Sequence, residues 1–162
     1  MDWEIQLDIL IEVAIAILLG GIIGLERDIA GKPAGLRTHM LLCGVSAFLV
    51  GTGNAFILSF KQSGMIDFIR ADPFRIMGAV ITGLSFIGAG SIIRTRQEDR
   101  VEGLTTAASL LFASAIGMSV ALGQLYLSIG ATILVVTVNS ALIYFEAWIK
   151  KIFKNRINKI LK

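Results

Sequence analysis

The chain has 162 residues, of which 55% are hydrophobic and only 17% are charged. Soluble domains of this size are nearer one-quarter charged, so the composition argues against a soluble globular protein. The net charge of +3 would suit a nucleic-acid-binding protein. However, much of the excess lies in the C-terminal tail and the rest flanks apolar runs, so we expect no nucleic acid as a partner.

Five long apolar runs follow one another, with charges clustered between them, as in a membrane protein. They cover residues 5–25, 39–60, 74–93, 103–122 and 125–147. Each run is near the ~20 residues that a helix needs to cross about 30 Å of hydrocarbon. We therefore expect an all-α, polytopic transmembrane bundle in one domain, residues 1–147, followed by a basic tail, residues 148–162. Only Gly123-Gln124 separates the last two runs, which predicts a tight helical hairpin.

Lys and Arg in the short loops indicate the orientation of such a bundle. They concentrate after the first and third runs and in the tail, which predicts an outside N-terminus and a cytoplasmic C-terminus. The acidic N-terminus lacks the basic start of a secretory signal, so the first run is expected to stay as a span. The tail alternates apolar and basic residues at helical spacing, which predicts an amphipathic helix on the anionic lipids of the cytoplasmic leaflet. Docking of this tail to an acidic partner is the alternative.

Small residues recur four apart in three of the runs, a pattern typical of helix packing in lipid. The members are Ala16, Gly20 and Gly24 in the first run, Cys43, Ala47, Gly51 and Ala55 in the second, and Thr105, Ser109, Ala113, Gly117 and Ala121 in the fourth. The third run carries Gly78, Gly83, Gly88 and Gly90. We expect it to be the central helix on which the first, second and fourth runs pack. The stripes also favour a homo-oligomer.

Two carboxylates, Asp8 and Glu12, share a helix face with Ala16 in the first run. A carboxylate at membrane depth is expected to face protein or water rather than lipid. Together with Asp72, which falls on the same predicted side, they form a candidate cation site at the outer mouth. The alternative is that the first span begins later and that both acids lie among the lipid headgroups.

A second polar group surrounds the predicted loop after the first run. Glu26 and Arg27 end that run, and the loop to His39 contains Pro33, Gly35 and Arg37. Arg37 is suited to bidentate pairing with Glu26 or with a phosphate. We expect His39 to be a polar residue at the membrane boundary.

The third and fourth runs each begin with polar residues. Asp72-Pro73 is typical of a helix N-cap followed by its first residue, and Arg75 follows within one turn. Thr105 and Thr106 open the fourth run and can bond backbone carbonyls or line a polar path. The chain lacks His/Cys metal-ligand spacing, Gly-x-Ser-x-Gly and a phosphate-binding glycine loop, so we expect no enzyme.

Taken together, five stretches resemble the MgtC/SapB family of bacterial membrane proteins. Their order and spacing match across about residues 12–123, while the fifth run matches in kind only. The stretches are Gly-Gly-Ile-Ile-Gly-Leu-Glu-Arg (20–27), Ala-Gly-Leu-Arg-Thr-His (34–39), Asp-Pro-Phe-Arg-Ile (72–76), Gly-Leu-Ser-Phe-Ile-Gly-Ala-Gly (83–90) and Gly-Leu-Thr-Thr-Ala-Ala (103–108).

The resemblance implies a multi-pass protein of the bacterial inner membrane that acts under magnesium limitation. Family members are often labelled magnesium transport proteins, and some are described as virulence factors that bind and restrain other membrane machines, including ATP synthase. We therefore expect a protein of magnesium homeostasis that binds and modulates other membrane proteins. The alternative is a transporter or channel for magnesium or another cation. The motif residues that carry over are Glu26, Arg27, Arg37, Thr38, Asp72, Arg75, Thr105 and Thr106.

This sequence differs from the family pattern in two respects. Many members append a soluble cytoplasmic domain after the last span, whereas this sequence continues into the basic tail. The position before Gly103 is usually basic in the family and is Glu102 here. We expect no cofactor, and Mg²⁺ is the one ion that the resemblance brings into consideration.

Overall fold

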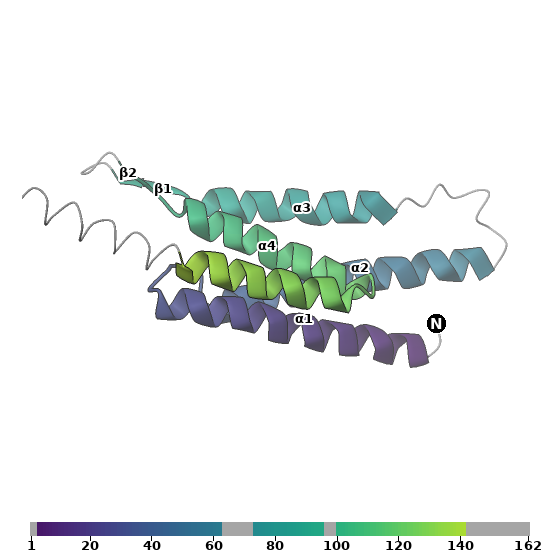
Figure 1. The fold of residues 1–162 in the computed structure, drawn as a ribbon. Helices are drawn as coiled ribbons and strands as arrows, with labels where there is room; N and C mark the ends of the chain where they lie inside the picture. Colours follow the sequence, from purple (N-terminus) through teal and green to yellow (C-terminus); the bar gives the residue numbers. More distant parts are fainter. Residues whose placement is uncertain (1–2, 63–72, 96–99, 142–162) are drawn as a thin grey trace, which may run out of the picture.

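The computed structural model describes residues 3–62, 73–95 and 100–141, which form a bundle of antiparallel helices (Figure 1). The helices are α1 Trp3–Ile29, α2 Leu36–Gln62, α3 Pro73–Gly90, α4 Leu104–Ala121 and a last, unlabelled helix, Leu125–Ala141. An antiparallel hairpin of two three-residue strands, β1 Ile93–Thr95 and β2 Arg100–Glu102, joins α3 to α4. The prediction of an all-α bundle is confirmed, and the hairpin is a small addition that the apolar pattern does not predict. The basic tail lies outside the described residues.

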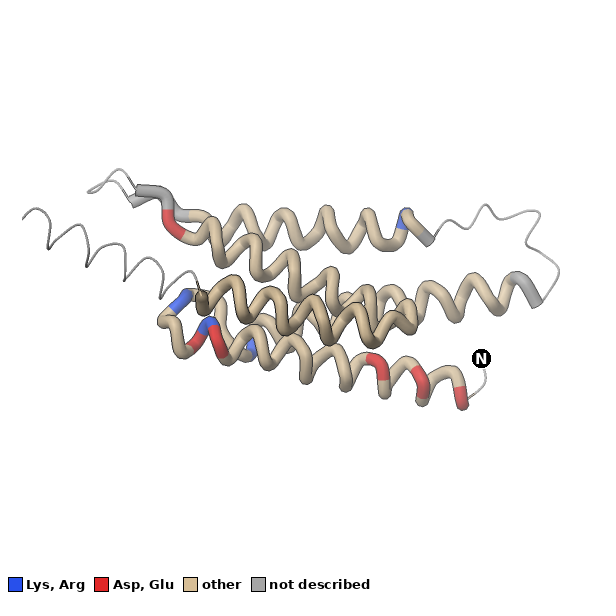
Figure 2. The backbone as a smooth tube through the Cα atoms, in the orientation of Figure 1, with Lys and Arg blue, Asp and Glu red and all other residues tan. Residues whose placement is uncertain are grey.

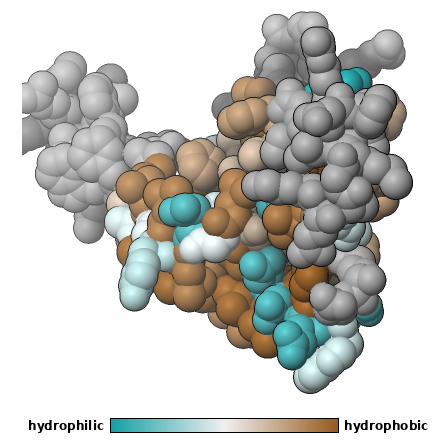
Figure 3. Space-filling view, turned by 90° about the vertical axis from the view of Figure 1, so that its right-hand side faces the viewer, coloured by the Kyte–Doolittle hydropathy of each residue, from teal (hydrophilic) through white to brown (hydrophobic). Residues whose placement is uncertain are grey.

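The described helices have the length and surface of membrane spans. Three of them, over Trp3–Ile29, Leu36–Phe60 and Leu104–Ala121, are long and apolar enough to cross a bilayer, while Phe74–Gly90 and Leu125–Ala141 are shorter apolar helices. Hydrophobic side chains cover much of the described surface seen from the end where α1 begins (Figure 3). Such a surface is unsuited to water and suited to hydrocarbon. The orientation of the bundle in the membrane stays a prediction.

The core lies where α1, α2 and α4 meet around Cys43. Ala16, Cys43, Ala47 and Ala113 have no exposed surface, so the small-residue stripes of the three helices face one another. At Gly20 a methyl group would lie 2.6 Å from the Cys43 Cβ. From α4, a methyl group at Gly117 would overlap the Cys43 carbonyl oxygen. Both crossings therefore require glycine.

The third helix lies at the edge of the bundle. It packs on α4 and, less extensively, on α2 (Figure 1). A methyl group at Gly78, Gly83 or Gly90 would meet no atom within 4 Å, and one at Gly88 would make ordinary contact with Ala107 at 3.6 Å. The prediction that this glycine-rich run is the central helix is wrong. The α1 and α4 stripes occupy the two sides of Cys43, so the centre of the bundle is already filled.

The turn between α4 and the last helix is closed by Gly123, as its position in the sequence predicts. The Gly123 N–H donates to the Val120 carbonyl at 2.9 Å and the Gln124 N–H donates to the Ser119 carbonyl at 3.0 Å. This is a Schellman motif, which requires the left-handed backbone that Gly123 adopts at φ 73°. The predicted tight hairpin is therefore confirmed.

The crossing at Gly117 yields a stability prediction. Gly117→Ala should force α2 and α4 apart and lower the free energy of unfolding by about 1–3 kcal/mol, the usual cost of overpacking. Unfolding of the purified protein in mixed SDS micelles measures this loss. Gly78→Ala is the matched control, since its methyl group would meet no atom within 4 Å. Equal stability of the two variants would contradict the assigned crossing.

Candidate functional site

Charged side chains of the described residues gather at the two ends of the bundle and leave its middle uncharged (Figure 2). At the end where α1 finishes and α2 and α4 begin, three helices bring together Glu26, Arg27, His39, Thr106 and Ser109. Arg27, His39, Thr106 and Ser109 are all buried, with exposed fractions of at most 3%. This buried cluster, called the polar end cluster below, is the strongest candidate for a site in the described part of the chain.

Glu26 and Arg27 form a two-pronged ion pair within the polar end cluster. The Arg27 Nε donates to Glu26 Oε2 and the Arg27 Nη2 donates to Glu26 Oε1, each at 2.6 Å. The side chains are 2% and 11% exposed, respectively. An ion pair so shielded from water leaves a costly lone charge if either partner is removed. Of the two partners considered for Arg37, Glu26 is ruled out because Arg27 already occupies both carboxylate oxygens, while a phosphate partner stays a prediction.

Arg37 and Thr38 instead belong to a separate hollow at the start of α2. Arg37 is exposed, and the hollow of about 340 Å³ is lined by Asp28, Gly35, Leu36, Arg37 and Thr38. The Leu36 N–H donates to Asp28 Oδ2 at 3.0 Å. Asp28 therefore helps to satisfy the first turn of α2 from the end of α1. Asp28 is not among the residues predicted from the family motifs.

His39 lies inside the bundle, with no exposed surface. Its Nδ1 lies 2.9 Å from the Gly35 carbonyl oxygen, so this nitrogen carries the hydrogen. Its Nε2 lies 3.0 Å from the Ser109 Oγ, and Ser109 Oγ also lies 2.9 Å from the Thr106 carbonyl oxygen. His39 is thus buried near the end of the bundle, and its place at the membrane boundary stays a prediction. Gly20 lets α1 close over this part of α2, since a methyl group there would lie 2.5 Å from the His39 carbonyl oxygen.

Two serine hydroxyls make a further polar contact between α2 and α4, deeper in the bundle. Ser46 Oγ lies 2.5 Å from Ser114 Oγ and 2.8 Å from the Leu42 carbonyl oxygen. Both serines have no exposed surface. Bonds of this kind fasten helices together where no water is present. The sequence does hold a signal for them, because His39 and Ser46 are seven residues apart and share a helix face.

The opposite end of the bundle holds the acids of α1. Asp8 is exposed, whereas Glu12 is partly buried and its Oε2 lies near Gly51 of α2. Asp72 lies outside the described residues, so the third member of the candidate cation site stays a prediction. Arg75 is exposed at the start of α3. Within the described ranges, no three His, Cys, Asp or Glu side chains are close enough to hold a metal ion.

The structure separates the remaining predicted residues into two groups. Thr106 is buried in the polar end cluster, while its neighbour Thr105 is exposed. Ala113 is fully buried, and Gly24, like Gly20 and Gly117, lies at a close crossing, 2.6 Å from the Leu36 Cα for an added methyl group. By contrast, Gly83 and Gly90 face open space within this chain.

Almost every buried side-chain nitrogen and oxygen atom in the described ranges has a hydrogen-bond partner. The one exception there is the Nδ2 of Asn139, in the last helix. Because these polar atoms already have hydrogen-bond partners, they hold the helices in register. They leave few donors or acceptors free to bind or move an ion. Within the polar end cluster, the His39–Ser109 hydrogen bond joins α2 to α4, and the Glu26–Arg27 pair neutralises two charges at the end of α1.

The Glu26–Arg27 ion pair yields a stability prediction. Arg27→Gln should lower the free energy of unfolding by about 3–5 kcal/mol, because it leaves a buried carboxylate without its partner. The double variant Glu26→Gln with Arg27→Gln should recover part of that loss. Arg37→Gln, at an exposed position, should change stability by less than about 0.5 kcal/mol. Unfolding in mixed SDS micelles measures all three, and a tolerated Arg27→Gln would overturn the assignment.

The chain is similar to known sequences of one family. The model of the MgtC family matches residues 13–148. The "Putative magnesium transporter YhiD" of Escherichia coli (strain K12) is 36% identical over 136 residues, covering 81% of this chain and 59% of that protein. Protein SapB of Bacillus subtilis (strain 168) is 32% identical over 160 residues, covering 98% of this chain and 66% of that protein.

The match extends to proteins of other bacteria. Protein MgtC of Brucella abortus (strain 2308) is 34% identical over 127 residues, covering 78% of this chain and 48% of that protein. The chain thus spans about half to two thirds of the length of these relatives. No solved structure matches it. With the family model covering most of its length and its helices apolar enough to span a bilayer, this chain is a membrane protein that belongs to the MgtC family.

Proposed function

We propose that this chain acts in magnesium homeostasis by binding and modulating other proteins of the bacterial inner membrane. The relative YhiD is named for magnesium transport, which connects this family to the ion. The proposal assigns the chain a non-enzymatic role without a resident cofactor, as a multi-pass protein. An energy-converting machine such as ATP synthase is one candidate partner, and a second copy of the chain is another.

One observation carries the proposal: the core is closed while α3 presents an unused packing surface. The core of α1, α2 and α4 is filled by fully buried small side chains and paired hydroxyls. On α3, by contrast, Gly78, Thr82, Ser85 and Ala89 are all exposed. Their spacing of four, three and four residues puts them on one face of the helix, called the α3 stripe below.

The α3 stripe has the chemistry of a helix-packing face in a membrane. The Thr82 hydroxyl donates to the Gly78 carbonyl and the Ser85 hydroxyl to the Ile81 carbonyl, each at 2.8 Å. These short side chains are therefore satisfied within α3 and leave the backbone accessible to another helix. Helices in lipid associate through such small residues because the close approach gains van der Waals contact.

A leucine on the α3 stripe tests the proposal. Gly78→Leu should abolish stoichiometric co-purification of the partner from membranes of magnesium-starved cells, and with it growth at low magnesium. The added side chain should leave folding intact, because a methyl group at Gly78 would meet no atom within 4 Å. Gly90→Leu is the matched control, since it adds the same bulk to α3 away from the stripe, at a position where a methyl group would also meet no atom within 4 Å. Normal low-magnesium growth of the Gly78 variant would overturn the proposal.

The second candidate function is cation transport, and the position of Glu12 favours it. Its carboxylate oxygen lies beside Gly51 of α2 and the side chain is partly buried, as expected of an acid that serves a polar site. On this hypothesis Asp8, Glu12 and Asp72 form the outer mouth. Purified protein in proteoliposomes would then take up Mg²⁺ faster than empty vesicles, and Glu12→Gln with Asp72→Asn would abolish that uptake. Flux equal to that of empty vesicles would contradict this function.

A further inference from the structure

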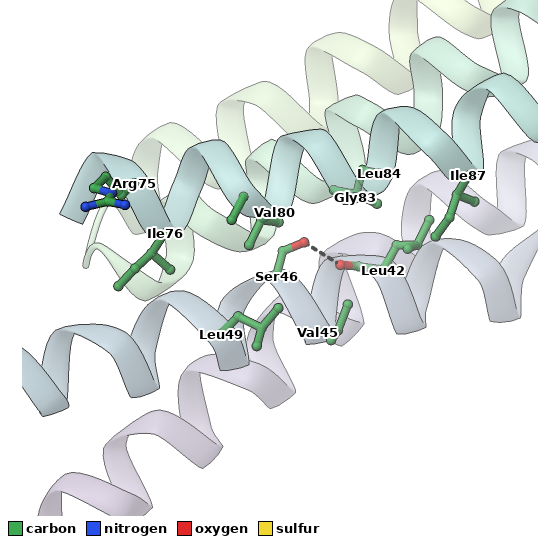
Figure 4. Close-up of a pocket in the computed structure, with 11 residues that line it drawn as sticks. Leu42, Val45, Ser46, Leu49, Arg75, Ile76, Val80, Gly83, Leu84 and Ile87 are labelled. Carbon is green, nitrogen blue, oxygen red and sulfur yellow. Dashed lines mark hydrogen bonds between the residues drawn. The ribbon is translucent and has the colours of Figure 1, made fainter. Parts of the chain in front are cut away.

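A long groove runs between α2 and α3 on the loosely packed side of the bundle (Figure 4). Its volume is about 580 Å³, within the range of pockets that hold small molecules. Val45 and Leu49 of α2 face Ile76, Val80 and Ile87 of α3 across it. It differs from the α3 stripe, which lies on another face of the same helix.

The walls of the groove select an apolar occupant. The serine in its lining, Ser46, has its hydroxyl paired with the Leu42 carbonyl and with Ser114, so it offers little to a polar ligand. An empty apolar groove would forfeit the van der Waals contacts that its lining atoms lack. In a membrane, the molecules that can supply these contacts along a narrow channel are acyl chains.

The length of the groove matches one lipid chain. Its lining runs along α3 from Arg75 to Ile87, which at 1.5 Å per residue is about 18 Å. One leaflet contributes about 15 Å to the hydrocarbon core of a bilayer. A single acyl chain therefore suffices to fill the groove from end to end.

Arg75 gives the groove a charged end. It lies at one end of the lining, with the aliphatic side chains following it along α3 (Figure 4). Its side chain is exposed and sits on the first turn of the helix, beyond the apolar part. A guanidinium group binds phosphate through two parallel hydrogen bonds. A cation at the mouth of an apolar groove of leaflet length complements an anionic lipid.

We propose that the groove between α2 and α3 binds one anionic phospholipid, with an acyl chain along Val45, Leu49 and Val80 and the headgroup phosphate on Arg75. The site is distinct from the predicted lipid contacts of the basic tail. Its apolar part is also separate from the partner-binding face, because Val80 and Gly83 line the groove while Gly78 lies on another side of α3. The bound lipid then supplies the van der Waals contacts with α3 that protein side chains do not make.

Native mass spectrometry of the full chain, purified in mild detergent, tests this site with phosphatidylglycerol and phosphatidylcholine as the two probes. The wild-type protein should retain one phosphatidylglycerol in preference to phosphatidylcholine by roughly tenfold or more, because the choline cation of phosphatidylcholine offsets its phosphate charge and repels the Arg75 guanidinium. Arg75→Gln should remove that preference. Neutralising Lys150 and Lys151 of the tail should leave it unchanged.

Two glycines of α3 provide matched variants. Gly83 lines the groove and Gly78 does not, and a methyl group at either would meet no atom within 4 Å. Gly83→Leu should fill the groove and abolish retention of the lipid, whereas Gly78→Leu should retain it. Equal retention of the two lipids by the wild-type protein, or unchanged retention by Gly83→Leu, would overturn the proposal. A preference that is lost only with the tail lysines would do the same.

Discussion

The close contact of α2 with both α1 and α4 around Cys43 is the constraint on which the rest of the structure depends. Gly20 and Gly117 approach this residue from two sides, and a side chain at either would collide with it. In hydrocarbon there is no hydrophobic driving force between helices, so such close contact supplies much of the attraction. The same closeness brings the His39 imidazole within hydrogen-bonding distance of Ser109 and Ser46 within that of Ser114.

The core also explains the peripheral place of α3. Two helices already occupy the small-residue sides of α2, so α3 packs on α4 and contacts α2 less extensively. One side of α3 then borders the apolar groove and another presents the α3 stripe. The molecule thus combines a closed core of α1, α2 and α4, to which Val135 of the last helix also contributes, with a helix α3 that leaves much of its surface unpacked. This division favours a function based on association within the membrane.

Features that depend on one residue and its neighbours were predictable. Gly123 marks the hairpin because a Schellman motif needs a left-handed residue at that point, and the structure has one there. The stripes through Ala16, Cys43 and Ala113 predict packing faces because small residues four apart share a side of a helix. The burial of His39 was not predictable in this way. It depends on α1 crossing over α2 at Gly20, a contact between separate segments.

The sequence by itself determined that this chain is a bundle of apolar helices, where those helices turn, and to which family it belongs. The bundle and its turns follow from hydropathy, helical periodicity and local backbone preference, whereas the family follows from the match of its sequence to known members. Only the tertiary structure decided which glycines lie at a crossing and which face open space, and that Glu26 pairs with Arg27 rather than Arg37. A small residue permits close approach without specifying its partner, so the choice among helices depends on how the whole set fills space.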